Sequence, residues 1–73
     1  MEELKIKDEF IKLGQALKLS GIAASGIDAK IMIQDGEVKY NGQTELQRGK
    51  KAYPGDTFEA AGKQFVVVKQ VKL

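Results

Sequence analysis

Cationic side chains at residues 48–51 form the densest cluster of potential chemistry in this sequence. The run reads RGKK and places Arg48, Lys50 and Lys51 almost side by side. It lies in a stretch without helical or strand-like apolar periodicity, so amphipathic patterning does not explain its charges. Guanidinium and ammonium groups donate charged hydrogen bonds to phosphate oxygens, and the cluster is therefore suited to binding phosphate.

Most catalytic chemistry is excluded by residue type. The chain has no cysteine and no histidine, which removes thiolate nucleophiles, imidazole bases and the usual zinc ligand sets. A chain of 73 residues also leaves little material for a concave site of about 300 Å³. We therefore expect no enzymatic activity, no catalytic residue, no metal site, no cofactor and no small-molecule substrate.

The composition indicates one small globular domain over residues 1–73. Hydrophobic residues make up 42% and charged residues 30%, a balance that favours folding over disorder. The net charge is only +2, so the overall field is weak and the local distribution of charge must decide the function. No apolar run approaches the roughly 20 residues that span a bilayer, and no signal peptide is recognisable at the start. We expect a cytoplasmic protein without a membrane partner.

A strand and a helix are predicted in the first 21 residues. Leu4 and Ile6 alternate with lysines, as in a half-buried strand. Asp8 is expected to cap a helix that stops near Gly21. The apolar residues that recur along one face of this helix are Phe10, Leu13, Ala16 and Leu17.

A second helix is predicted after Ser25. Ser25 and Asp28 resemble a capping box, and Gly36 is placed to end the helix in a left-handed conformation. Lys30 and Gln34 are four residues apart and are expected on the solvent-facing side. The residues expected on the apolar face are Ile27, Ala29, Ile31 and Ile33.

Tight turns and short strands are predicted for the second half of the chain. Asn41-Gly42 is a strong hairpin signal, and Pro54-Gly55 is typical of a type II turn before a strand at about 57–61. Gly62-Lys63 is expected to turn the chain back into a strand at 64–71. The predicted fold class is α+β, with two packed helices against a small, hairpin-rich, mainly antiparallel sheet.

The order of several short pieces resembles an S4-type RNA-binding domain, whose S4-like (αL) fold combines two helices with a hairpin. The resemblance covers about residues 12–60 of the single domain, and its specificity comes from the combined order. The matching pieces are Lys12-Leu13-Gly14, Ser25-Gly26, Ala29-Lys30, Ile33-Gln34-Asp35-Gly36, Val38-Lys39-Tyr40-Asn41-Gly42 and Pro54-Gly55-Asp56. The small size and the RGKKAYPGD segment are similar to the stand-alone S4-domain proteins of bacteria, the YaaA/YbcJ type.

This resemblance implies a non-catalytic protein that binds structured RNA, with rRNA, tRNA and the ribosome as the expected partners. Recognition would rest on the RNA backbone and its shape, through the second helix, the following hairpin and the RGKK loop. The residues implied as RNA contacts are Lys12, Ser25, Gly26, Lys30, Gln34, Lys39, Asn41, Arg48, Lys50 and Lys51.

Three positions depart from the family pattern. Lys12 replaces an arginine, Gly14 replaces an aspartate, and Gly26 stands where many members carry a second-helix arginine. The two arginine positions would each supply a guanidinium group that binds phosphate through two hydrogen bonds. Their replacement by Lys12 and Gly26 shifts the expected phosphate contact toward the RGKK run. Structural roles compete at Ser25 as a helix cap and at Asn41 as a turn residue.

The sequence allows a second interpretation of the two tyrosines and of the function. Tyr40 and Tyr53 could stack on bases, although packing beneath the hairpin is favoured. The alternative function is a protein-interaction module of a ribosomal or replication complex, since ten acids interleave with twelve bases. A continuous face of cations would favour RNA; acids breaking up that face would favour the protein partner.

Overall fold

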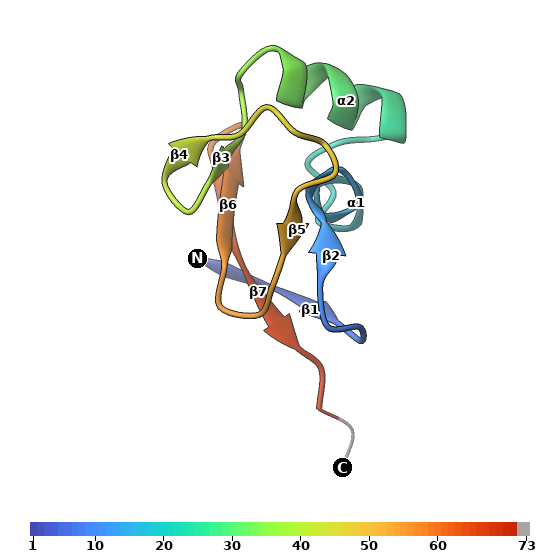
Figure 1. The fold of residues 1–73 in the computed structure, drawn as a ribbon, viewed down its shortest axis with the longest axis vertical. Coiled ribbons are helices and arrows are strands. Elements are labelled where there is room, and N and C mark those ends of the chain that lie inside the picture. The colour runs from blue at the N-terminus through green and yellow to red at the C-terminus, as the bar shows by residue number, and fades with distance from the viewer. Residues whose placement is uncertain (72–73) are drawn as a thin grey trace.

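The computed structural model describes residues 1–71 and contains two helices and seven strands in that range. Figure 1 shows the helices together at one end of the molecule. In chain order the elements are β1 (Glu2–Ile6), β2 (Ile11–Lys12), α1 (Leu13–Leu19), α2 (Gly26–Gln34), β3 (Lys39–Tyr40), β4 (Gln43–Thr44), β5 (Lys51–Ala52), β6 (Thr57–Ala60) and β7 (Lys63–Lys69).

The strands form a five-stranded sheet of order β1-β7-β6-β3-β4 and a separate two-stranded pair, β2-β5. Among the described residues, only β1 and β7 pair in parallel, with Glu2 opposite Phe65 and Ile6 opposite Lys69. The other pairings are antiparallel. The predicted α+β class, with two helices against a mainly antiparallel sheet, is confirmed.

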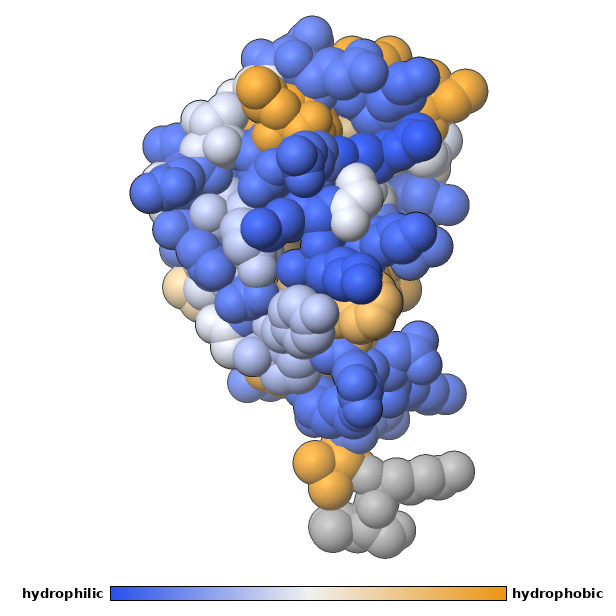
Figure 2. Space-filling model, viewed as in Figure 1, coloured by the Kyte–Doolittle hydropathy of each residue, from blue (hydrophilic) through white to orange (hydrophobic). Residues whose placement is uncertain are grey.

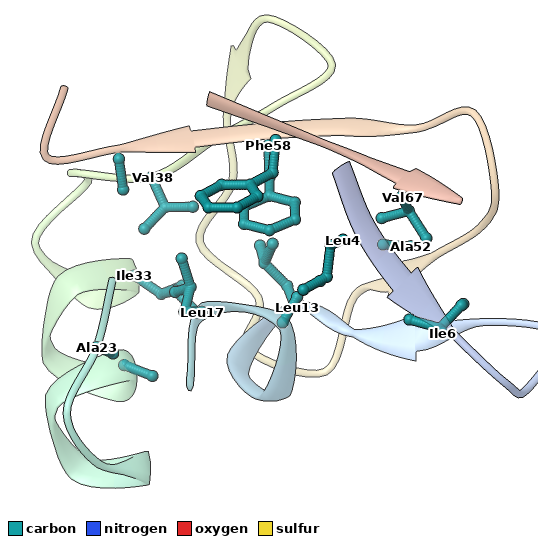
Figure 3. Packing of buried hydrophobic residues seen from close by; sticks show 14 residues of the cluster. Leu4, Ile6, Leu13, Leu17, Ala23, Ile33, Val38, Ala52, Phe58 and Val67 are labelled. Carbon is teal, nitrogen blue, oxygen red and sulfur yellow. The ribbon is translucent and has the colours of Figure 1, made fainter. Parts of the chain in front are cut away.

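One apolar core joins the helices to the sheet. Leu17 of α1 and Ile33 of α2 are fully buried and point toward Phe58 of β6 (Figure 3). The Phe58 ring stacks on Phe65 of β7, with the two ring centroids 5.5 Å apart. Leu4 and Ile6 add the inner face of β1 to this core, as their alternation with lysines predicts.

The start of the first helix was predicted wrongly. Asp8 is not its N-cap, because Ile11 and Lys12 are extended and pair with β5, and the helix begins at Leu13. Phe10 therefore lies outside the helix. Its spacing to Leu13 fits a helical face, but pairing with a distant strand overrides this local pattern. The remaining buried positions of α1 agree with the prediction.

The second helix has the predicted ends but a narrower buried face. The Asp28 amide donates to the Ser25 hydroxyl oxygen at 3.2 Å, which confirms the N-cap, and Gly36 has φ of 75°. Ile27 and Ile31 were wrongly placed inward, since they are 72% and 49% exposed. Residues two apart on a helix point roughly 200° apart, so burial of Ala29 and Ile33 turns the other pair outward.

The left-handed turns fall close to their predicted positions. Asn41 and Gly42 have φ values of 51° and 85°, which confirms the first predicted turn. Gly55 has a φ of 96°, which confirms the Pro54-Gly55 turn. The last turn is displaced by one residue: Ala61 and Gly62 carry the positive φ, whereas Lys63 already pairs with Ala60. The final strand therefore starts one residue earlier than predicted. It also ends two residues earlier, so that it spans 63–69 rather than 64–71.

Substitution of Leu17 tests the packing of the core. We expect Leu17→Ala to lower the free energy of unfolding by about 2–5 kcal/mol, because its fully buried side chain leaves a cavity. Leu19→Ala is the matched control on the same helix: Leu19 is 60% exposed, and its change should stay within about 0.5 kcal/mol. Urea unfolding followed by circular dichroism measures both. Equal losses would contradict the burial of Leu17 in the core.

Candidate nucleic-acid interface

The basic segment, defined as residues 48–51, is held against the first turn of α1 by backbone hydrogen bonds. The Leu13 amide donates to the Lys50 carbonyl at 2.8 Å, and the Gly14 amide donates to the Arg48 carbonyl at 3.1 Å. Amides at a helix start lack partners within the helix, and here the loop supplies them. The same bonds fix the backbone from which the cations project.

Gly14 lets the Arg48 side chain cross the helix start. A Cβ atom at this position would lie 2.7 Å from Cγ of Arg48 and 3.3 Å from its Cδ. Any larger residue would have to displace the arginine stem. The departure at Gly14 therefore has a packing reason that the sequence did not reveal: the glycine replaces an acid and makes room for a cation.

Four of the predicted RNA contacts are brought together around this segment. Lys12 is opposite Lys51 in the β2-β5 pair, and Arg48 and Lys50 are tied to α1. The surface over β2, β5 and the loop before β5 is mostly hydrophilic (Figure 2). Lys12, Arg48 and Lys51 are exposed, and Lys50 is partly exposed.

Aromatic rings lie next to two of these cations. The Lys51 ammonium lies 4.9 Å from the centre of the Phe10 ring, and the Lys50 ammonium lies 5.3 Å from that of Tyr40. Phe10 also contacts Tyr53, with ring centroids 5.7 Å apart. Sequence reasoning missed Phe10, because the helix prediction assigned it to the core.

The predicted contacts on α2 form a second, separate group. Gly26, Lys30 and Gln34 are exposed, and Ser25 at the helix start is partly exposed. The Ser25 hydroxyl oxygen already accepts a hydrogen bond as the helix cap. Around Gly26 there is room, since a Cβ atom at this position would have Cδ of Lys18, 3.9 Å away, as its nearest neighbour.

The two predicted RNA contacts on the hairpin, Lys39 and Asn41, differ in how far their side chains are already engaged within the protein. Lys39 is exposed on β3, but its cross-strand partner on β6 is Glu59, whose charge opposes its own. Asn41 is engaged inside the protein. Its Oδ1 accepts from the Thr57 amide at 2.8 Å and its Nδ2 donates to the Asp56 carboxylate at 3.3 Å.

The Asp56 carboxylate connects this hairpin to the 53–56 turn. Besides Asn41, it accepts hydrogen bonds from the Tyr40 hydroxyl and, at 2.8 Å, from the Tyr53 amide. The Tyr40 hydroxyl also lies 3.4 Å from the Lys51 carbonyl oxygen. One acid therefore positions parts of the chain that carry both tyrosines next to the basic segment.

The pKa values of this network follow from its contacts. Burial, followed by the hydrogen bond to Asp56 and the negative charge of that group, raises the pKa of Tyr40 to about 12. Burial by itself would raise the pKa of Asp56. The hydrogen bonds from Tyr40, Tyr53 and Asn41, together with the charge of Lys50, outweigh burial and lower that pKa.

Neither helix in residues 1–71 is long and apolar enough to cross a bilayer. The same residues contain no group of three or more His, Cys, Asp or Glu side chains arranged to hold a metal ion.

Comparisons with known proteins agree on one family. The model of the family described as "S4 domain" matches residues 4–68. The Probable ribosome maturation protein RlbA of Bacillus subtilis (strain 168) is 41% identical over 59 residues, which cover 81% of this chain and 83% of the relative. YbcJ of Escherichia coli (strain K12) is 39% identical over 62 residues, covering 85% and 89%.

A solved structure supports the same relation. The solution structure of E. coli YbcJ superimposes with a TM-score of 0.71 at 36% identity, and it covers 93% of this chain and 87% of that one. It is described as revealing an alfaL motif involved in RNA-binding. The predicted S4-like fold and the predicted relation to stand-alone S4-domain proteins are confirmed.

Asp56 gives a pH-dependent prediction. The pKa of Asp56 is lowered in the folded state, so the ionised carboxylate stabilises the fold. This stabilisation is complete at pH values above about 3.9, the ordinary pKa of aspartate, and is lost as pH falls through the folded-state pKa. We expect Asp56→Asn to cost about 1–2 kcal/mol at pH 7, because charged hydrogen bonds are weakened. The difference from wild type should shrink as pH falls below about 4.

Urea unfolding across this pH range measures the effect. Asp8→Asn is the matched control, because it removes an exposed carboxylate outside the network. A constant difference between wild type and Asp56→Asn at every pH would rule out the ionised Asp56 as the stabilising group.

Proposed function

Because the chain belongs to the S4 domain family, we propose that it is a non-catalytic RNA-binding protein that recognises structured RNA by backbone and shape. The observation that carries this proposal is the grouping of Lys12, Arg48, Lys50 and Lys51 on a rigidly anchored backbone. Phosphate contacts of this kind release counterions, so affinity falls steeply as salt rises. They carry little sequence information.

The second group, on α2, would extend the contact along the RNA. Lys30 and Gln34 project from the exposed side of the helix, and the amide at Gly26 is not shielded by a side chain. Backbone amides at a helix start and the positive end of the helix dipole both favour a phosphate. Lys39 would add a contact from the hairpin, weakened by its neighbour Glu59.

The class of RNA is a finer part of the proposal. The Bacillus subtilis relative is named for ribosome maturation, and E. coli YbcJ is described in terms of RNA-binding. These names support rRNA within the ribosome or its precursors as the partner, with tRNA as the other structured candidate. For such a role we propose a cytoplasmic location.

A second candidate function is protein interaction, and a specific observation favours it. Ile27 and Ile31 are exposed on α2, beside Lys30 and Gln34. An apolar contact at this face would respond weakly to salt, whereas phosphate contacts respond strongly. Salt dependence therefore separates the two functions.

Removal of two cations from the basic segment tests the RNA-binding proposal. We expect Arg48→Gln/Lys50→Gln to weaken binding of a fluorescently labelled RNA stem-loop and to reduce the slope of log affinity against log salt by about 2. Glutamine retains the carbon stem that packs on Gly14, so the loop should keep its place. Fluorescence anisotropy between about 50 and 200 mM KCl gives the affinity and the slope.

The control for this variant is Lys63→Gln/Lys69→Gln, which lowers the net charge equally but acts on exposed β7 positions. It should bind almost as wild type does. Equal weakening by the two variants would mean that net charge, rather than the basic segment, attracts RNA. Unaltered binding by Arg48→Gln/Lys50→Gln would contradict the proposed interface.

Gly26 offers a gain-of-function test of the α2 contact. Gly26→Arg restores the family's second-helix arginine, and the open space around the residue accommodates it. We expect tighter RNA binding and a slope steeper by roughly 0.7 to 0.9, the effect of one added phosphate contact. Gly26→Ala controls for the helix-propensity gain that both variants share. If arginine and alanine gave the same affinity and slope, α2 would not face the RNA backbone.

A further inference from the structure

Phe10 and Tyr53 form an aromatic pair at the surface beside the basic segment. Their ring centroids are 5.7 Å apart and their planes are tilted by 47°. Phe10 is partly buried, whereas Tyr53 is 47% exposed. Large aromatic side chains cost free energy when they are left in water, and an exposed ring next to cations is a common feature of surfaces that bind nucleic-acid bases.

The backbone of Tyr53 is fixed, so its ring projects from a rigid turn. Its amide donates to the Asp56 carboxylate at 2.8 Å, and its carbonyl accepts from the Asp56 amide at 2.9 Å. Pro54 follows directly and restricts the chain further. A preorganised ring loses little conformational freedom when a ligand stacks on it.

Positive charge lies within reach of the pair. The Lys51 ammonium is 4.9 Å from the centre of the Phe10 ring, and Lys12 is opposite Lys51 across the β2-β5 pair. Phe10 also lines a surface groove of about 360 Å³, whose other lining residues are Lys5, Ile6, Lys7, Asp8, Ile11, Gln15, Leu19 and Gln70. Aromatic rings flanked by lysines can hold a base and its phosphates at the same time.

We propose that Phe10 and Tyr53 form a stacking site for one unpaired nucleotide of the bound RNA, with Lys51 holding its phosphate. This inference rests on the proposed function and adds a feature to it: the protein prefers a looped-out or single-stranded nucleotide next to a helix over an uninterrupted duplex. In an uninterrupted duplex the bases stack on each other, and their faces are not available to Tyr53.

A fluorescent base analogue tests the site. The probe is an RNA stem-loop with 2-aminopurine at an unpaired position, and the comparison RNA is an uninterrupted duplex of the same length. Wild-type protein should quench the 2-aminopurine fluorescence and bind the stem-loop more tightly than the duplex. Tyr53→Leu should abolish the quenching and weaken stem-loop binding by about 5- to 100-fold, as expected for one lost base–aromatic stack.

Tyr53→Phe is the matched control, because it keeps the ring and removes only the hydroxyl; it should behave as wild type. Tyr53→Leu should leave the salt slope and the affinity for duplex RNA unchanged, whereas Lys51→Gln should reduce the slope by about 1. Phe10→Leu supplies a second variant on the other ring. Circular dichroism confirms that each variant is folded.

The outcomes separate this inference from the proposed function. If Tyr53→Leu and Phe10→Leu bind and quench as wild type does while Arg48→Gln/Lys50→Gln binds more weakly and with a smaller salt slope, the stacking site is wrong and the phosphate interface stands. If wild-type protein binds neither RNA, both proposals are wrong.

Discussion

The Asp56 carboxylate accepts three hydrogen bonds, and the arrangement of the proposed interface depends on them. It joins the Tyr40-Asn41 hairpin to the turn that presents Tyr53, and those parts of the chain are separated by more than ten residues. A neutral side chain could not satisfy three donors equally well, because an ionised carboxylate offers acceptor sites on both oxygens. The acid is therefore best understood as a structural part of a basic surface.

The basic segment gains its rigidity from backbone bonds rather than from its side chains. Carbonyl oxygens of Arg48 and Lys50 occupy the amides at the start of α1, so this helix start is not available to an anion. In the proposed interface, phosphate would be attracted at this place by side-chain charge, whereas the start of α2 keeps open space at Gly26. In the proposed interface the basic segment would act through cationic side chains alone, whereas α2 would act through Lys30, Gln34 and the open helix start at Gly26.

Local signals explain which features could be predicted from sequence. The Ser25 cap and the Asn41-Gly42 turn depend on residues adjacent in the chain, and both were predicted correctly. The start of α1 depends on pairing with β5, some forty residues away, and no local pattern contains that information. The same long-range pairing places Phe10 beside Lys51 and Gly14 beneath Arg48. For this reason the cations could be named from the sequence, but their aromatic neighbours and their anchoring could not.

The parallel pairing of β1 with β7 has a consequence for synthesis of the chain. Residues 2–6 find their partners only at residues 65–69, so the edge of the sheet cannot close until those residues have been made and have left the ribosomal tunnel. Until then Leu4 and Ile6 lack their place in the core. Contacts between such distant segments slow folding, because the closure of a long loop precedes the stabilising contacts. The first strand of this domain is therefore among the last elements of the fold to be secured.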